Sequence, residues 1–210
     1  MTMHRKTCRP IMPTVEATAL LRAADVVLDD RTVLRAIDLE IGPGVTVVRG
    51  RNGAGKTTLL RALAGLIPLA RGTRRVPAEL LYLGHRPQLH RSLSAAENLS
   101  FFARYRGGDA TGVRDALAAW GVPDAARPAE RLSAGQRRRA SLARLETERC
   151  PLVLLDEPFA ELDDDASSRL AAIVAAAGGR GQAVVIATHG RTDLISDRTV
   201  RLEGGAIVGS

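Results

Sequence analysis

Short apolar stretches, separated by turn-forming residues, run along most of the chain and predict its secondary structure. The predicted strands are short apolar or alternating runs, and they cover residues 20–27, 33–41, 45–48, 80–83, 151–155 and 183–187, with a hairpin over 200–208 that turns at Gly204-Gly205. The predicted helices have apolar residues at helical spacing. The first contains Leu59, Leu60, Leu63 and Leu66 and is ended by Gly65 and Pro68. The others cover residues 94–106, 112–120, 133–148 and 165–177. Strands that alternate with helices indicate an α/β core with a β-rich start and a helical insertion.

A single domain accounts for almost the whole chain. With 210 residues and a mass of 22.4 kDa, the protein can bury a core without disulfides. We expect the domain to span residues 14–210, with the helical insertion at about residues 88–145. Residues 1–13 are basic and lack the apolar run of a secretory signal. They are interpreted as a disordered tail, or as sequence upstream of a true start at Met12.

Cysteine content and hydropathy exclude several classes of protein. The two cysteines, Cys8 and Cys150, lack the spacing of metal ligands. This fits a reducing compartment and argues against a disulfide scaffold or a zinc module. The longest unbroken apolar run, residues 170–177, is much shorter than the ~20 residues of a spanning helix. The chain is therefore not expected to be a membrane channel itself.

The net charge of +7 comes from basic residues spread along the chain, so no nucleic-acid partner is expected. The run Arg137-Arg138-Arg139 is interpreted as a solvated helix face in preference to a nucleic-acid patch. Of the 30 basic residues, 28 are arginine and only Lys6 and Lys56 are lysine. A lysine kept inside the fold against this bias predicts a role that arginine cannot fill, such as placing a compact ammonium among phosphates.

A glycine-rich loop with the spacing G-x-x-x-x-G-K-T lies between a predicted strand and a predicted helix. Its glycines let backbone N–H groups turn toward phosphate oxygens, and the helix adds its positive end. Lys56 is expected to reach the β- and γ-phosphates and the Thr57 hydroxyl to bind Mg²⁺. A chance glycine turn is the alternative, but the strand and helix around the loop favour nucleotide binding. The predicted nucleotide-binding residues of this segment are Gly50, Arg51, Asn52, Gly53, Ala54, Gly55, Lys56, Thr57 and Thr58.

Two acidic residues follow the predicted buried strand 151–155. Ligands of open α/β sheets bind outside the carboxyl ends of the strands, which is where Asp156 and Glu157 are expected to lie. Asp156 is predicted to hold Mg²⁺ through water, and Glu157 to polarise the attacking water. Alone, the pair could equally be two solvated acids at a strand end; beside a phosphate loop, the catalytic interpretation is favoured.

Five motifs in this order resemble the ATP-binding cassette (ABC) ATPases. Besides the phosphate loop and the acid pair, residues 132–136 (LSAGQ) are similar to the L-S-G-G-Q signature, with Ala134 in place of glycine. Glu161-Leu162-Asp163 resembles the D-loop, and His189 resembles the switch histidine. The resemblance extends from about residue 18 to 210. It implies a P-loop NTPase (RecA-like) core with an antiparallel β subdomain and an inserted helical subdomain.

Ser133 is placed as a helix N-cap, so the helix that starts there would present a second anion-binding end. The resemblance implies a head-to-tail dimer with a second ATPase subunit, a copy of the same chain. In such a dimer Ser133, Gly135 and Gln136 of one subunit would contact ATP held by the other. His189 would hold the γ-phosphate and the attacking water, and Asp163 would link the two sites. Without the resemblance, His189 would be interpreted as a structural residue.

The sequence departs from the family pattern at two positions. Where the family places an aromatic residue that stacks on adenine, this chain has Leu28, so the base would be held by apolar contact alone. The family also expects a glutamine after the strand 80–83 that touches Mg²⁺ and the transporter. Our alignment places Arg86 there, and Gln88 two residues later. Gln88 is taken as a metal-ligand candidate, with Arg86 as the alternative coupling residue.

A chain of this kind resembles the ATPase subunit of a transporter, docked from the cytoplasmic face on a separate membrane permease. Residues 83–87, 97–102, 132–145 and 155–159 are most similar to the haem-export ATPases of cytochrome c maturation. The alternatives are the ATPase of another small-molecule or drug exporter, or a soluble regulatory ABC ATPase.

Half of the six aromatic residues of the chain lie in one predicted helix, as Phe101, Phe102 and Tyr105. Their spacing places them near one helix face. We expect them to belong to the core of the helical insertion. The alternative is that they line a groove that receives a helix of the permease.

Overall fold

The computed structural model describes residues 18–122, 124–190 and 195–209. The predicted tail of residues 1–13 lies outside these residues. The boundaries proposed for the domain and for its helical insertion stay predictions.

A six-stranded sheet forms the centre of the fold, in the order β5-β6-β7-β3-β8-β9. Its strands are β3 (Gly44–Arg49), β5 (Leu80–Leu83), β6 (Leu152–Asp156), β7 (Ala183–Thr188), β8 (Arg198–Glu203) and β9 (Ala206–Gly209). All neighbours pair in parallel except β8 and β9, which form the predicted antiparallel hairpin at Gly204-Gly205. The parallel arrangement brings the carboxyl ends of β3, β5, β6 and β7 to one edge of the sheet.

Both faces of this sheet are buried, which explains why its central strands are continuous apolar runs. On β3, Val47 packs into one core and Val48 into the other. On β7, Val184 and Val185 divide between the two cores in the same way. The period of two residues therefore places one core on each side of the sheet.

A second, antiparallel sheet has the order β2-β1-β4 and is formed by β1 (Ala19–Leu28), β2 (Arg31–Ile41) and β4 (Arg71–Arg75). The turn between β1 and β2 consists of Asp29 and Asp30, both with positive φ (45° and 59°), as a tight two-residue hairpin requires. The sequence pattern predicted β1 and β2 but missed β4. All five residues of β4 are exposed, so this strand has no apolar pattern and is defined by its backbone pairing with β1.

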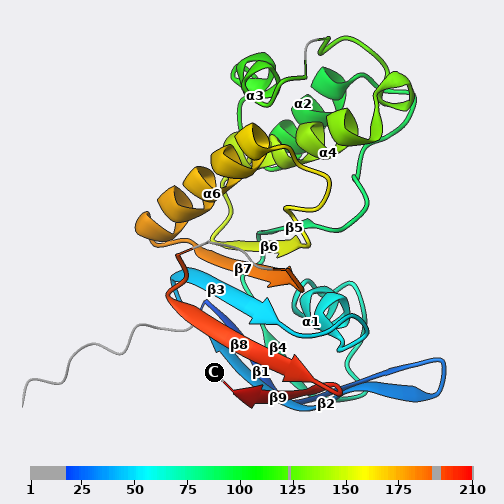
Figure 1. Ribbon diagram of the computed structural model, residues 1–210, viewed down its shortest axis with the longest axis vertical. Coiled ribbons are helices and arrows are strands. Elements are labelled where there is room, and N and C mark those ends of the chain that lie inside the picture. Colours follow the sequence, from blue (N-terminus) through cyan, green and yellow to red (C-terminus); the bar gives the residue numbers. More distant parts are fainter. Residues whose placement is uncertain (1–17, 123, 191–194, 210) are drawn as a thin grey trace, which may run out of the picture.

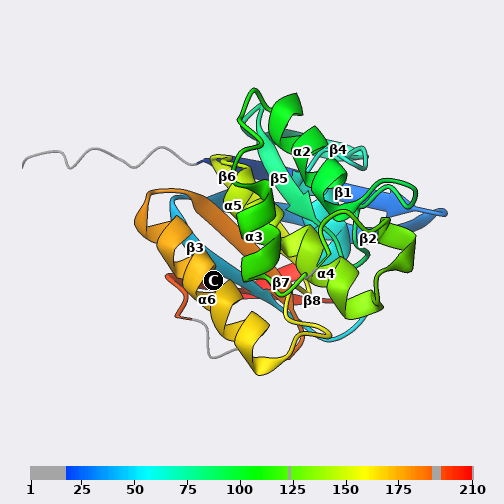
Figure 2. The ribbon, with the colours of Figure 1, turned by 90° about the horizontal axis from the view of Figure 1, so that it is seen from above.

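Six α-helices within the described residues cover the central sheet (Figures 1 and 2). They are α1 (Lys56–Leu63), α2 (Ala95–Tyr105), α3 (Val113–Ala119), α4 (Ala134–Leu142), α5 (Arg144–Thr147) and α6 (Asp164–Gly179). The side chains of α1 pack between the two sheets, whereas α6 and the helical insertion cover the opposite face of the six-stranded sheet. The core that holds α1 is thus separated by the sheet from the core that holds α4.

Two predicted helix boundaries were wrong. Helix α1 ends at Leu63, so Leu66 lies beyond it and is 59% exposed. The residues predicted as one helix over 133–148 form two, because Ala143 caps α4 and α5 starts at Arg144.

A buried ion network joins the helical insertion to the central sheet. Glu148 is fully buried and accepts hydrogen bonds from Arg144 and, at 2.6 Å, from Arg106 Nε. Arg106 also donates to the carbonyl oxygen of Leu80 at the start of β5, at 2.6 Å. Because unpaired buried charges are costly, this network holds the end of α2 against β5.

The expected core position of the aromatic cluster was wrong for two of its members. Phe101 is 59% exposed and Tyr105 is 80% exposed. Their rings stack on each other with centroids 6.2 Å apart. Phe102 is half-buried, with the Arg144 guanidinium 3.6 Å from its ring centroid. None of the helices in the described residues is long and apolar enough to cross a membrane.

Candidate active site

The phosphate loop follows β3 and ends at α1, as predicted. A Cβ on Gly50 would lie 2.3 Å from the carbonyl oxygen of Leu202 on β8, so only glycine permits this approach. Gly55 has φ +101° and forms the N-cap of α1, where no side chain caps the helix. The first N–H groups of α1 are therefore free of side-chain partners, and with the helix dipole they make an anion-binding end.

Lys56 is the first residue of α1 and is only 7% exposed. Its Nζ donates hydrogen bonds to the carbonyl oxygens of Gly50 at 2.9 Å and Arg51 at 3.2 Å. The same nitrogen lies 3.7 Å from Glu157 Oε1. The ammonium therefore bridges the loop and the acid pair, where triphosphate oxygens would need a compact charge.

Thr57 and Asp156 form the second contact between the loop and β6. Thr57 Oγ1 donates to Asp156 Oδ1 at 3.1 Å. Asp156 is 1% exposed, and its Oδ2 is buried without a hydrogen bond to any described residue. Burial raises the pKa of the Asp156 carboxyl above its ordinary value, while the Thr57 hydrogen bond opposes the shift. A buried carboxylate with a free oxygen beside a hydroxyl is a donor set that suits Mg²⁺.

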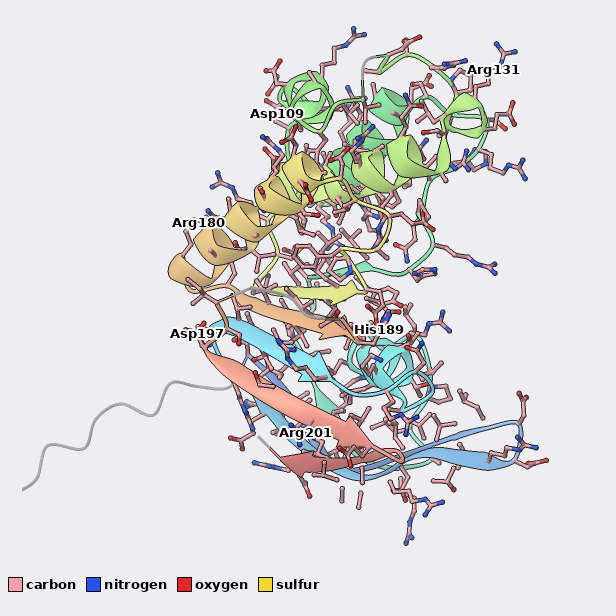
Figure 3. All side chains as sticks on the ribbon, viewed as in Figure 1. Asp109, Arg131, Arg180, His189, Asp197 and Arg201 are labelled. Carbon is pink, nitrogen blue, oxygen red and sulfur yellow. The ribbon has the colours of Figure 1, made fainter. Side chains whose placement is uncertain are left out.

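Glu157 has φ +47°, a left-handed conformation that is uncommon for a residue with a side chain. Its backbone N–H donates to the carbonyl oxygen of Ala187 on β7 at 2.9 Å. Its Oε1 lies 2.7 Å from His189 Nδ1. His189 follows β7 and lies beside α1, as Figure 3 shows. The structure thus brings the two predicted catalytic residues into contact.

A hollow of about 370 Å³ lies over these groups. Its lining includes many of the predicted residues, namely Asn52, Gly53, Gly55, Lys56, Thr57, Thr58, Glu157 and His189. Two lining residues were not predicted, Val33 and His85. His85 could have been found by the rule used for Glu157, because it follows the carboxyl end of the neighbouring strand β5. Gln88 is exposed and does not line this hollow, and its proposed role as a metal ligand stays a prediction.

The predicted signature residues lie on α4, away from this hollow. Ser133 caps α4: its Oγ accepts a hydrogen bond from Gln136 N at 3.1 Å, and Gln136 Oε1 accepts one from Ser133 N at 2.9 Å. The N-cap prediction for Ser133 is therefore confirmed. Gln136 has its side chain in this cap, and Gly135 is half-buried in the first turn. Their contacts with a nucleotide of another subunit stay predictions.

Asp163 uses both carboxylate oxygens within its own chain. Oδ1 accepts from Ala166 N at 2.9 Å and caps α6, and Oδ2 accepts from Arg139 Nη1 at 2.7 Å. The D-loop is thereby tied to the signature helix.

The interpretation of Arg137-Arg138-Arg139 as a solvated face was wrong for Arg138, which is 3% exposed. A charged pattern on a short helix cannot reveal that one of its cations reaches main-chain acceptors on strands far away in the sequence.

Comparison with known proteins identifies the family. The family model described as "ABC transporter" matches residues 34–160, which include the phosphate loop, the signature and the acid pair. The chain belongs to the ABC transporter family. As an ABC ATPase, it binds ATP and hydrolyses it.

Two solved ABC structures share the fold. One, from Pyrococcus furiosus, has a TM-score of 0.75 at 24% identity, and the match covers 88% of this chain and 96% of that structure's chain. The other, an ATP-binding subunit of an ABC transporter, has a TM-score of 0.84 at 20% identity, and the match covers 91% of this chain and 88% of that structure's chain.

Several ABC relatives carry the same name, "Cytochrome c biogenesis ATP-binding export protein CcmA". The protein of Nitrobacter winogradskyi is 43% identical over 84% of this chain and 93% of its own length. That of Paracoccus denitrificans is 49% identical over 70% of each chain. That of Salmonella paratyphi A, CcmA 1, is 40% identical over 84% of this chain and 93% of its own. This ABC ATPase is therefore similar to these CcmA proteins over 70% to 93% of their length.

Proposed function

We propose that this ABC ATPase is the ATP-hydrolysing subunit of an export system for cytochrome c biogenesis, and that it works at the cytoplasmic face of the cell membrane with a separate membrane permease. The physiological part of the proposal is supported by 43% identity to a CcmA protein across 93% of that protein's length. The transported molecule is inferred to be haem from the sequence resemblance described above.

The observation that carries the chemical part is the position of Glu157 at the mouth of the phosphate loop. Its Oε1 lies between His189 Nδ1 at 2.7 Å and Lys56 Nζ at 3.7 Å. With ATP bound, Lys56 and the start of α1 would hold the phosphates. Glu157 would then take the proton of the attacking water, and His189 would orient this carboxylate and contact the γ-phosphate.

Thr57 and Asp156 are the residues that would hold Mg²⁺. The buried free oxygen of Asp156 beside the Thr57 hydroxyl supports this assignment. When bound, the ion would neutralise charge that develops on the phosphate oxygens. The protein's own part is to keep this carboxylate dehydrated and oriented by the Thr57 hydrogen bond.

We expect replacement of Asp156 by asparagine to abolish turnover while raising the stability of the nucleotide-free protein by about 1 kcal/mol at pH 7. Burial raises the pKa of this carboxyl, so its charged form costs stability in the folded state. This cost is present above the folded-state pKa and disappears as the pH falls through it, so the advantage of the variant should shrink toward pH 4. Thermal denaturation between pH 7 and pH 4, without nucleotide, measures it. A less stable variant at pH 7 would contradict the expectation.

The second ATPase subunit is proposed to bind head to tail. Helix α4 begins at Ala134 with Ser133 as its N-cap, and its first turn contains no acidic residue. This end favours an anion, which in the proposed dimer is the γ-phosphate held by Lys56 of the other copy. ATP would then join two identical surfaces, and its hydrolysis would separate them.

The permease is proposed to dock on a groove beside α2. A hollow of about 740 Å³ lies there, lined by Ala96, Glu97, Ser100, Phe101, Arg104, Tyr105, Ala110, Thr111, Val113 and Arg114. The exposed rings of Phe101 and Tyr105 give it an apolar wall, and exposed aromatic residues are typical of binding surfaces. An amphipathic helix at the cytoplasmic end of a permease is the partner that this groove suits.

Replacing Phe101 and Tyr105 together by serine tests the transporter function. The double variant is expected to keep its ATPase activity in solution, since both side chains are exposed and distant from the phosphate loop. It should no longer sediment with membranes that contain the permease, nor restore cytochrome c formation in cells that lack their own ATP-binding subunit. Leu66→Ser, at an equally exposed leucine outside the groove, is the matched control. Full restoration by the double variant would favour a soluble regulatory ATPase instead.

A further inference from the structure

The buried guanidinium of Arg138 connects α4 to the ends of two strands in the active site. Its Nη1 donates to the carbonyl oxygens of Gly84 at 2.7 Å and His85 at 3.3 Å, directly after β5. Its Nη2 donates to the carbonyl oxygens of Glu157 at 2.7 Å and Asp156 at 3.3 Å, at the end of β6. One planar group therefore holds two consecutive carbonyls directly after β5 and two at the end of the neighbouring strand β6.

Arginine suits this position because its donors are fixed in one plane and remain charged. The side chain is 3% exposed, and burial lowers the pKa of the guanidinium. A buried cation is tolerated only where hydrogen bonds satisfy it, and here main-chain carbonyl oxygens do so. Within the described residues no ion pair joins Arg138 to a carboxylate, and its hydrogen bonds all go to backbone carbonyl oxygens.

The backbone that Arg138 holds at β6 is that of the proposed general base. Glu157 has a strained φ of +47°. Its N–H is held by Ala187 and its carbonyl oxygen by Arg138, so the peptide groups on both sides of its Cα are fixed. The direction of the Glu157 side chain, and with it the 2.7 Å contact to His189, depends on this backbone.

We propose that Arg138 is a positioning residue for ATP hydrolysis, which fixes the main chain of Glu157 and His85 from α4. The inference rests on the proposed function, in which Glu157 is the general base. Because Ser133 caps the start of α4, a shift of this helix when it meets the nucleotide of the other subunit would reach Glu157 through one guanidinium. The clamp thereby links contact between subunits to the orientation of the carboxylate.

The test compares Arg138→Gln with Arg131→Gln, an equal change of charge at an exposed arginine just before α4. We expect Arg138→Gln to lower kcat about 10- to 100-fold, as misplacement of a catalytic group by about 1 Å does. ATP affinity, measured with a fluorescent ATP analogue, and KM should stay within about twofold. Arg131→Gln should match the wild type in all three measurements.

A double variant separates positioning from general support of the fold. If Arg138 acts through Glu157, then Arg138→Gln should lower the residual turnover of Glu157→Gln protein little further. In Glu203→Gln protein, which carries the same change of charge at an exposed glutamate of β8, it should have its full effect. Arg138→Lys keeps the buried charge but has one nitrogen, which cannot reach both pairs of carbonyls. It should retain the low kcat even where it restores thermal stability.

Three results would overturn the proposal: a wild-type kcat in Arg138→Gln, an equal loss of kcat with and without Glu157, or recovery of kcat by Arg138→Lys in step with its stability. If Arg138→Gln does not fold, Arg138→Lys carries the same comparisons. Turnover near the wild-type rate in Glu157→Gln alone would contradict the proposed function, separately from the effect of Arg138.

Discussion

Glu157→Gln should lower ATP turnover about 1,000-fold, within the range that removal of a general base produces. The change leaves the size of the side chain almost the same but removes its ability to take a proton. It also removes the negative charge 3.7 Å from Lys56 Nζ, so ATP affinity should not fall and the ammonium is freer to meet the γ-phosphate. Steady-state phosphate release and equilibrium binding measure the two effects on the same preparation.

The same variant tests the proposed dimer, because ATP that is bound but not hydrolysed should hold two copies together. With ATP and Mg²⁺, Glu157→Gln protein should elute as a dimer in size-exclusion chromatography, and without nucleotide as a monomer. Adding Ser133→Glu, which brings a like charge toward the γ-phosphate, should abolish the dimer while leaving the phosphate loop unchanged. Glu203→Gln is the matched control at an exposed glutamate of β8. A Glu157→Gln protein that stays monomeric at saturating ATP would rule out the ATP-joined arrangement.

Lys56→Ala should weaken ATP binding at least about 100-fold, since a desolvated contact between an ammonium and phosphates contributes several kcal/mol. The Lys56 side chain is 7% exposed, and no other lysine or arginine is among the described residues that line the hollow. Calorimetric titration with ATP gives the affinity directly. Thermal denaturation without nucleotide should show a small change only, because the Gly50 and Arg51 carbonyls that Lys56 holds can turn to water.

Lys56→Arg distinguishes the shape of the cation from its charge. The guanidinium is larger and planar, and it cannot be enclosed by the loop that surrounds the ammonium. We expect Lys56→Arg to restore less than a tenth of the ATP affinity that Lys56→Ala loses. The chain uses arginine at 28 of its 30 basic positions, so a lysine here indicates that arginine does not serve. Arg201→Ala removes a positive charge at an exposed arginine of β8 and is the net-charge control for Lys56→Ala. Wild-type affinity in Lys56→Arg would show that charge alone is required.

The sequence predicts those parts of the fold in which the pattern of side chains directly reflects the backbone structure. Strands such as β6 and β7 are fully buried, so they are continuous apolar runs, and the phosphate loop needs glycines that the pattern displays. Because the strands are parallel, the acid pair after β6 and His189 after β7 could be expected at one edge of the sheet. In the structure Glu157 Oε1 lies 2.7 Å from His189 Nδ1 at this edge.

The parts that could not be predicted depend on partners remote in the sequence. Strand β4 pairs through its backbone alone, so its exposed sequence Arg-Gly-Thr-Arg-Arg carries no signal. Arg138 is buried because its guanidinium finds backbone carbonyl acceptors that are remote in the sequence. Gly84, directly after β5, is 54 residues away, and Asp156 and Glu157, at the end of β6, are 18 and 19 residues away. Phe101 and Tyr105 follow a helical spacing, which shows that they share a face but not whether another element covers it.

The contacts that Lys56 already makes affect how a nucleotide enters the phosphate loop. Its ammonium already has two carbonyl acceptors and a nearby carboxylate, so it has shed most of its hydration before any phosphate arrives. Entry of ATP is then an exchange of partners around a cation that is dehydrated in advance. The affinity for ATP is then set by the difference between two sets of contacts. A subunit that must release ADP in every cycle gains from this, because the empty loop can take back its own lysine as the product leaves.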